Sequence, residues 1–228
     1  MWSHVPALKS AGTLMFGDFR VNDDARIERI ASRLLDQPET VEEGAAFLPD
    51  WQPETPPGRP PVPAAVLIAL VRRAEGHTVL YTARSADLRA HSGQVAFPGG
   101  KIDPQDTGPG AAALREAFEE VAMAPQDARI LGYMPHYYTG TNYLITPVVA
   151  EVTPSAPFVA NPHEVDALFE VPLKLIATEA GWGRFRISRN GKTHETWQVL
   201  HEGHTIWGIT ANLTRRFRDL TLTGEDKW

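Results

Sequence analysis

Seven prolines between residues 49 and 63 constrain how this 228-residue chain can fold. Proline has no backbone N–H donor and holds φ at about −65°, so neither a helix interior nor a central strand can run through this segment. We therefore expect an extended linker on the surface. The linker divides the chain into an N-terminal extension, residues 1–62, and a main domain, residues 63–228.

One helix is expected in the N-terminal extension. Between residues 23 and 36, apolar side chains recur at three- and four-residue intervals, namely at Ile27, Ile30, Ala31, Leu34 and Leu35. These intervals are typical of an amphipathic helix that buries one face. The extension is therefore predicted to be helical and to pack on the main domain.

The main domain mixes short strands with two helices. Strands are predicted at residues 64–71 and 78–82, which form a hairpin, and at residues 130–135, 145–152, 165–171, 185–188 and 193–200. Helices are predicted at residues 111–122 and 210–220. The dipeptide Asn190-Gly191 is typical of a tight hairpin turn. This order indicates a mixed α/β fold rather than the regular alternation of a doubly wound sheet.

Composition and charge exclude several classes of function. The chain has 22 Lys and Arg against 28 Asp and Glu, a net charge of 22 − 28 = −6, which disfavours a nucleic-acid binder. The absence of cysteine excludes disulfides and thiolate ligands. No apolar run reaches the roughly 18 residues of a membrane span, and the N-terminus lacks a signal-peptide pattern. We expect a cytoplasmic protein that inserts in no membrane and binds no nucleic acid.

The predicted helix at residues 111–122 carries three glutamates on one face. At about 100° per residue, Glu116, Glu119 and Glu120 fall beside Arg115, and the opposite face is expected to comprise Leu114, Ala117, Phe118 and Val121. Clustered like charges destabilise a helix by roughly 0.2–0.5 kcal/mol per pair, so the cluster favours a bound cation. Carboxylate oxygens suit Mg²⁺ or Mn²⁺ in phosphate chemistry. The alternative is a solvated helix face without a ligand.

Two motifs resemble the Nudix hydrolase family. Residues 100–123, which include Arg115-Glu116-Ala117-Phe118-Glu119-Glu120, resemble the Nudix box. An upstream motif resembles the coenzyme A pyrophosphatase branch of that family, and it consists of Leu80-Tyr81-Thr82-Ala83-Arg84-Ser85, Arg89, Gly93 and Phe97-Pro98-Gly99-Gly100. The wider resemblance covers residues 63–220. It implies an α/β/α Nudix fold in which a mixed, curved sheet lies between helices.

Two residues depart from the Nudix box. Asp106 stands where the box has its first glutamate, and its spacing to Arg115 is one residue longer than in the general box, a length that resembles this branch. Ala122 replaces the glycine of the box. If that position requires a positive φ, alanine costs about 1 kcal/mol there, whereas in a helical backbone it costs nothing.

The resemblance implies a role for each matched residue. Mg²⁺ or Mn²⁺ would be bound by Glu116, Glu119 and Glu120, with the carbonyl of Gly100 as an additional ligand. Arg115 would hold the loop by pairing with Asp106 or with a neighbouring glutamate. The candidate catalytic residues are Arg115, Glu116, Glu119, Glu120 and Glu164.

The general base is open at this point. Glu116 or Glu119 could serve, and in this family the base often comes from a distant loop, where Glu164 is the candidate. Asp166 and Glu170 are weaker alternatives. The competing interpretation of Glu164 is a surface glutamate at the start of a strand.

Basic side chains near the two motifs suggest how substrate is bound. Arg84, Arg89, His91 and Lys101 concentrate positive charge in an otherwise acidic chain, and arginine suits the oxygens of a pyrophosphate. Phe97 and Tyr138 complete the candidate substrate-binding residues. Tyr138 belongs to an aromatic segment that could stack on adenine, line the path of the pantetheine arm, or pack within its loop.

The resemblance implies Mg²⁺- or Mn²⁺-dependent hydrolysis of the pyrophosphate of coenzyme A or its acyl derivatives. One alternative is hydrolysis of another nucleoside diphosphate derivative, such as ADP-ribose or NADH. Another alternative is a nucleotide-binding module that no longer catalyses. The expected partner is a small molecule, and the sequence leaves the oligomeric state open, a homodimer included.

Overall fold

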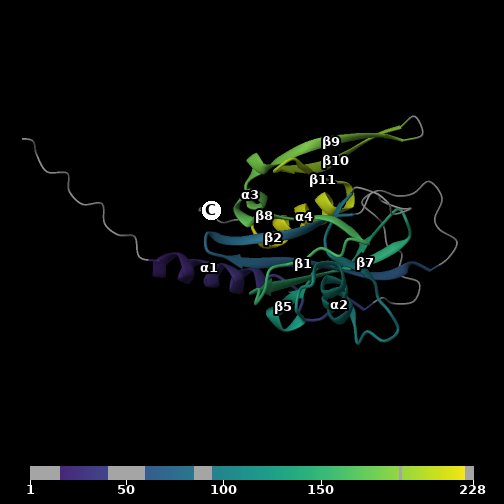
Figure 1. Ribbon diagram of the computed structural model, residues 1–228. Helices are drawn as coiled ribbons and strands as arrows, with labels where there is room; N and C mark the ends of the chain where they lie inside the picture. The colour runs from purple at the N-terminus through teal and green to yellow at the C-terminus, as the bar shows by residue number, and fades with distance from the viewer. Residues whose placement is uncertain (1–15, 41–59, 85–93, 190–191, 224–228) are drawn as a thin grey trace, which may run out of the picture.

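Strands β1 (Val62–Arg73) and β7 (Tyr143–Val152) run parallel at the centre of an eight-stranded mixed sheet. The structure, a computed structural model, describes residues 16–40, 60–84, 94–189 and 192–223 (Figure 1). The proline-rich segment up to residue 59 therefore lies outside the described residues, as do Arg89 and His91. The remaining strands pair antiparallel with this centre or with one another. They are β2 (Gly76–Arg84), β3 (Val95–Ala96), β4 (Gly99–Lys101), β5 (Ala128–Tyr133), β6 (Tyr137–Tyr138) and β8 (Val165–Pro172).

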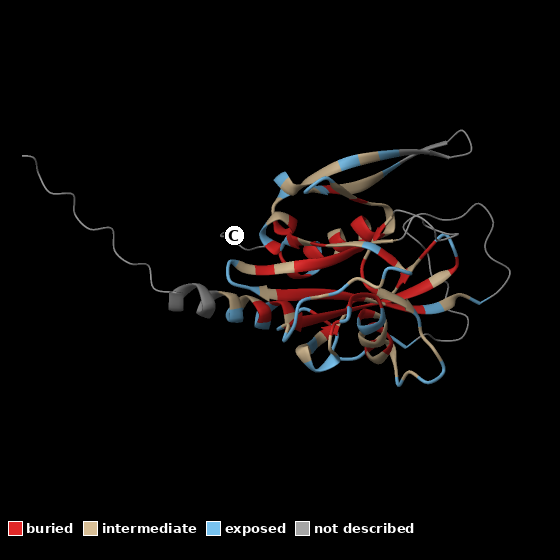
Figure 2. Cartoon of the chain, viewed as in Figure 1, coloured by how far each residue is buried: buried red, intermediate tan, exposed pale blue. Residues whose placement is uncertain are grey.

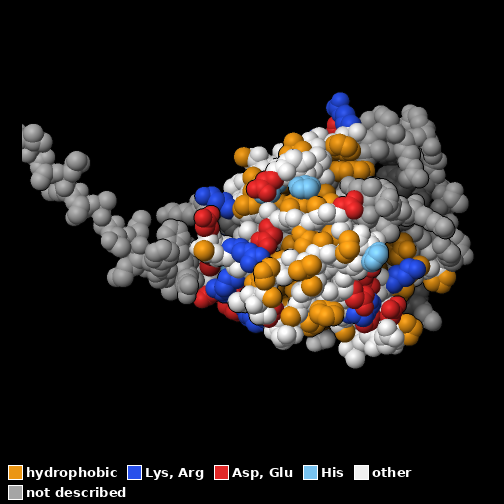
Figure 3. Space-filling view, in the orientation of Figure 1, with side chains coloured by type: hydrophobic (Ala, Val, Ile, Leu, Met, Phe, Trp, Pro, Cys, Tyr) orange, Lys and Arg blue, Asp and Glu red, His pale blue; other side chains and the backbone are white. Residues whose placement is uncertain are grey.

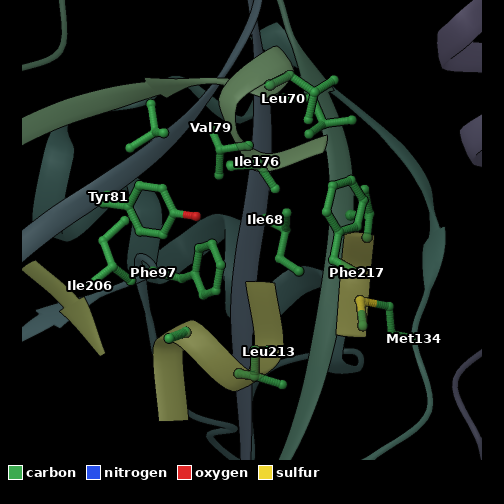
Figure 4. Close-up of a cluster of buried hydrophobic side chains, with 14 of the residues drawn as sticks. Ile68, Leu70, Val79, Tyr81, Phe97, Met134, Ile176, Ile206, Leu213 and Phe217 are labelled. Carbon is green, nitrogen blue, oxygen red and sulfur yellow. The ribbon is translucent and has the colours of Figure 1, made fainter. Parts of the chain in front are cut away.

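Side chains of β1 alternate between two hydrophobic cores. Leu67 and Val71 point to the face covered by helix α2 (Pro109–Val121), together with Ala65 and Ala69. Ile68 and Leu70 point to the opposite face (Figure 4). A strand that is buried on both faces has to be apolar at nearly every position, which explains the continuous apolar run in this part of the sequence.

The opposite face is covered by three helices and a second sheet. The helices are α1 (Phe16–Ala31), α3 (Leu173–Ala177) and α4 (Gly208–Thr221), and short 3-10 turns occur at Pro125–Asp127 and Glu179–Gly181. The second sheet has three antiparallel strands, β9 (Trp182–Arg189), β10 (Lys192–His201) and β11 (His204–Trp207). Figure 2 shows the buried residues concentrated in the sheet and in the inner faces of its helices. The predicted α/β/α Nudix fold with a mixed sheet is confirmed.

The N-terminal helix packs through the first part of the predicted face, whereas Leu34 and Leu35 follow the helix and Leu35 is 38% exposed. Ile27 and Ile30 are each 1% exposed in the same core as Phe217 of α4. The helix ends at Ala31, five residues before the predicted end, because the chain then pairs with β5. Leu35 and Tyr133 exchange backbone hydrogen bonds of 2.9 and 2.8 Å there.

None of the helices in the described part of the chain has the length and hydrophobicity of a membrane-spanning segment.

One side chain that was predicted on the buried apolar face of α2 is exposed. Ala117 and Val121 are buried as expected, whereas Phe118 is 56% exposed. Phe118 lies at the border between the apolar and acidic faces of the helix, where the sheet beneath α2 no longer covers it. The expectation that Phe118 packs in the core was wrong.

The backbone at Ala122 decides between the two alternatives stated for that residue. Ala122 has φ 53° and ψ 30°, a left-handed conformation. Its N–H donates to the carbonyl of Phe118, and the next N–H, of Met123, donates to the carbonyl of Ala117, which ends the helix in the arrangement that usually employs glycine. Alanine is therefore the less favourable residue at this position.

We predict that Ala122→Gly raises the free energy of unfolding by roughly 0.5–1 kcal/mol, because glycine adopts positive φ without a steric penalty. Urea unfolding of the metal-free protein measures the change. Ala124→Gly is the matched control, since Ala124 has φ −67° in the same loop and its replacement should destabilise the protein. Equal effects of the two substitutions would contradict the prediction.

Candidate active site

The paired glycines let β4 lie directly against helix α2. A Cβ atom on Gly100 would lie 2.5 Å from the carboxyl carbon of Glu116, and one on Gly99 would lie 2.4 Å from the carbonyl oxygen of Ala65 in β1. At Gly99 the neighbours are backbone atoms of β1, so no side chain fits there, whereas a side chain at Gly100 would displace the carboxylate of Glu116. The two glycines therefore let the backbone of β4 lie close to β1 and to the carboxylate of Glu116.

Arg115 ties the loop after β4 to helix α2. Its Nε and Nη2 donate to the two carboxylate oxygens of Asp106 at 3.1 and 3.0 Å, and Nη2 also donates to the carbonyl of Lys101 at 3.1 Å. Nη1 donates to Glu116 at 2.9 Å and to Glu119 at 3.1 Å. The hydrogen bonds from Arg115 lower the pKa of Asp106, so this pair stays charged.

Glu120 is the buried carboxylate of the group. Its side chain is 3% exposed, and its described partners are the N–H of Gly99 at 3.3 Å and Nη1 of Arg84 at 3.8 Å. Burial raises the pKa of Glu120 to about 8, and the negative charges of Glu116 and Glu164 add to this effect against the opposing charge of Arg84. Burial likewise raises the pKa of Glu116. Both carboxylates thus lie where additional positive charge would stabilise them.

An irregularity in strand pairing occurs at Arg84, the residue that lies beside Glu120. Ala83 of β2 pairs with Ala167 of β8, whereas Arg84 pairs with Val165, so Asp166 is an extra residue on β8. Such a bulge re-aims the side chains around it. Arg84, the last residue of β2, lies at the same end of the sheet as Glu120.

The loop that carries Glu164 is fixed to the end of helix α2. The N–H of Asn161 donates to the carbonyl of Glu120 at 2.9 Å, and the N–H of Val159 donates to the carbonyl of Val121 at 3.0 Å. The carbonyl of Asn161 then accepts the N–H groups of Glu164 and Val165. Glu164 is half-buried, and its charge acts on both Glu116 and Glu120. The structure therefore brings this distant glutamate to the acidic helix.

These residues fit a hard divalent cation. The group offers carboxylate oxygens from Glu116, Glu119 and Glu120, and the burial of Glu120 among like charges is the environment that a cation relieves. Within the described residues, no group of three or more His, Asp or Glu side chains is arranged to bind a metal ion as it stands. Arg115 pairs with Glu116 and Glu119 in this arrangement.

The other candidate substrate-binding residues are placed differently. Lys101 is exposed, and its backbone carbonyl rather than its ammonium contacts Arg115. Phe97 is 3% exposed and stacks on Tyr81 in the core, with 4.9 Å between ring centroids, so its ring packs in the interior. Tyr138 lies in β6, and its hydroxyl donates to the side chain of Asn142 at 2.6 Å. Strands β1 and β7 lie between β6 and β4, so Tyr138 is remote from the acidic helix.

The weaker candidates for the base also differ from Glu164. Glu170 accepts hydrogen bonds from Arg73 and Thr78, which lower its pKa despite its burial, so it is committed to a structural ion pair. Asp166 is exposed in the bulge of β8. The sequence did not predict the hydrogen bond from the N–H of Asn161 to the carbonyl of Glu120, which holds this loop against α2.

The fold agrees with the comparisons to known proteins. The family model of the NUDIX domain matches residues 61–190, and the chain belongs to this family. It is thus a Nudix hydrolase, a class that acts on nucleoside diphosphate derivatives and commonly uses Mg²⁺ or Mn²⁺.

Among individual relatives, the chain is similar to two bacterial proteins described as "Uncharacterized Nudix hydrolase NudL". The relative from Escherichia fergusonii is 44% identical over 152 residues, and the one from Salmonella paratyphi B is 43% identical over 152 residues. Each match covers 67% of this chain and 79% of the relative. The crystal structure of the Nudix hydrolase RenU from M. smegmatis is 21% identical, with a TM-score of 0.49 over 75% of this chain and 91% of that one.

The raised pKa of Glu120 predicts how the metal-free protein responds to pH. In the folded state the carboxyl keeps its proton up to about pH 8, whereas its ordinary pKa is 4.5. Between these values the folded state binds more protons, so the free energy of unfolding falls as pH rises, by at most about 1.4 kcal/mol per pH unit. Glu120→Gln should abolish this contribution.

Thermal unfolding in chelator from pH 5 to 9 measures the difference. Added Mg²⁺ should stabilise the wild type at pH 8 and have little effect on Glu120→Gln. The control is Glu119→Gln, because the side chain of Glu119 is 50% exposed and should leave the pH dependence unchanged. The same pH dependence in the wild type and in Glu120→Gln would contradict the assignment.

Proposed function

We propose that the protein hydrolyses the pyrophosphate of coenzyme A or acyl-coenzyme A, with Mg²⁺ or Mn²⁺, to 4′-phosphopantetheine or its acyl form and adenosine 3′,5′-bisphosphate. The proposal rests on the contact between Arg84 and Glu120, at 3.8 Å. Arg84 belongs to the motif that resembles the coenzyme A pyrophosphatase branch, and Glu120 belongs to the general Nudix box. Their proximity supports a single site for both motifs.

The chain's own groups divide the work of phosphoanhydride hydrolysis. Arg84 is proposed to bind a non-bridging phosphate oxygen, where a guanidinium offers paired donors. Glu116, Glu119 and Glu120 are proposed to hold the cation with the carbonyl of Gly100. When bound, that cation supplies neutralisation of the phosphate charge and an activated water. Arg115 acts as a positioning residue, since it holds the loop and two of these carboxylates.

Glu164 is proposed as the general base. Its backbone is fixed through Asn161 to the carbonyl of Glu120, and its charge reaches both Glu116 and Glu120. A carboxylate held near the metal-binding group is suited to accept a proton from the attacking water. Glu116 and Glu119 are less suited, because both already accept hydrogen bonds from Arg115.

Product analysis separates the proposal from its alternatives. Coenzyme A, ADP-ribose and NADH are incubated in parallel with Mg²⁺, with Mn²⁺ and with chelator. We predict metal-dependent release of adenosine 3′,5′-bisphosphate from coenzyme A, faster than turnover of the other substrates and lost in Glu120→Gln. Preference for ADP-ribose or NADH would keep the reaction class and reject the substrate. Nucleotide binding without any turnover would identify a non-catalytic module.

Arg84 provides a second test of the substrate. Arg84→Ala should raise the KM for coenzyme A about 10- to 100-fold, because that change corresponds to the loss of one or two charge-assisted hydrogen bonds. Arg84→Lys should raise the KM less than Arg84→Ala does. If Arg84 binds the pyrophosphate, the KM for 3′-dephospho-coenzyme A rises by the same factor. Arg186→Ala is the matched control, because Arg186 is 76% exposed in β9. An unchanged KM in Arg84→Ala would refute the assignment.

A further inference from the structure

A pocket of about 680 Å³ lies along strand β8, outside the group of carboxylates. Its apolar lining comes from Leu80, Phe158, Leu168 and Phe169, and Glu170 and Arg73 add charge. One wall is the segment at residues 154–158 that follows β7, and Glu202 in the turn between β10 and β11 lines the other side. Figure 3 shows hydrophobic side chains gathered on the face in view, with charged side chains toward its left and lower right borders.

Charged and aromatic contacts hold the pocket lining in place. Arg73 donates to both carboxylate oxygens of Glu170, at 3.0 and 2.5 Å, and its guanidinium lies 5.6 Å from the centre of the Phe158 ring. On the other face of β8, the Phe169 ring stacks on His204 of β11, with 4.0 Å between ring centroids. The pocket is therefore built by ordered side chains from several elements.

The outer edge of β8 runs along this pocket. Among the residues that the structure describes, β8 pairs with β2 alone, so one edge of β8 has no strand beside it. A strand edge offers a row of N–H and C=O groups, and an extended ligand with its own amides can pair with such a row. The apolar lining adds contacts for the remainder of such a ligand.

The pocket and the proposed catalytic site lie along the same face of β2. Leu80, which lines the pocket, and Arg84 lie four residues apart on the same face of β2, about 13 Å along the strand. On the opposite wall, Phe158 precedes Val159, whose N–H is bonded to the end of α2 next to Glu120. A substrate whose phosphates lie at Arg84 and Glu120 could therefore extend along β8.

We propose that this pocket binds the pantetheine arm of the substrate, with its amides paired to the edge of β8. This inference rests on the proposed function. The arm carries successive amide groups and a dimethyl carbon. With the spacing of an extended peptide chain its length is about 15 Å, which matches the distance between Leu80 and Arg84 along β2. Arg73 and Glu170 lie at the end of the pocket away from Arg84, where the thiol or acyl group would reach.

A bulky side chain in the pocket wall tests the proposal. Ala156 is exposed and lines the pocket, so Ala156→Trp fills it without disturbing the core. The substrates are coenzyme A and adenosine 3′-phosphate 5′-diphosphate, which keeps the pyrophosphate and lacks the arm. We expect the KM for coenzyme A to rise about tenfold or more while the KM for the armless compound changes less than about twofold. Ala180→Trp, an exposed position outside the pocket, is the control.

Binding of 4′-phosphopantetheine separates this proposal from the proposed function. If the wild type does not hydrolyse coenzyme A, the proposed function is wrong. The pocket assignment then holds if calorimetry shows that 4′-phosphopantetheine binds the wild type and not Ala156→Trp, and it fails if the wild type does not bind. Equal KM changes for the two substrates, or none, would overturn it. A dimer in solution that Ala156→Trp dissociates would assign the pocket to a second copy of the chain and overturn it as well.

Discussion

The contact between Arg115 and Asp106 is the interaction on which the geometry of the acidic site depends. The guanidinium of Arg115 donates hydrogen bonds to Asp106 in the loop after β4, to the carbonyl of Lys101 and to two carboxylates of α2. The side chains of Arg115 and Asp106 are 22% and 5% exposed, and loss of Arg115 would leave the Asp106 carboxylate without its charged partner. The backbone of β4 and the acidic face of α2 are thereby held as one unit, close enough that a Cβ atom on Gly100 would displace the carboxylate of Glu116.

This fixed unit also explains why Glu120 is buried at a cost. The carboxylate is enclosed by β4, by the end of β2 and by the loop that Asn161 attaches to α2. Stability alone would favour an apolar residue there. Burial raises the pKa of Glu120, and the charge of Arg84 offsets this only in part, so a divalent cation would stabilise the enclosed carboxylate.

The parts of the structure predicted from sequence are those that local periodicity determines. The central strands, α2, α4 and the face of α1 followed from apolar spacing, and the shared face of Glu116, Glu119 and Glu120 followed from helix geometry. Phe118 was assigned wrongly because helical spacing alone does not show where a neighbouring sheet ends. The short strands β3, β4 and β6 were not predicted, since two or three residues carry no periodic signal.

Contacts between distant segments were beyond the reach of the sequence. Phe97 was expected at the substrate because of its motif, yet its side chain stacks on Tyr81, which only the register of β3 beside β2 determines. Glu164 was placed near the site by resemblance, and its physical cause is the backbone bond between Asn161 and Glu120.

If the proposed roles hold, one strand, β8, contributes to both catalysis and specificity. At its beginning, the bulge at Asp166 lies beside Arg84 of β2, which contacts Glu120, and the preceding loop brings the charge of Glu164 near the same carboxylate. Further along, Leu168 and Phe169 line the pocket. Because a strand is stiff and advances by about 3.4 Å per residue, the distance between the two regions is set by residue number along β2 and β8 rather than by a mobile loop. A substrate would then be selected by whether its length and amides match that fixed spacing, while the chemistry at the carboxylates stays the same.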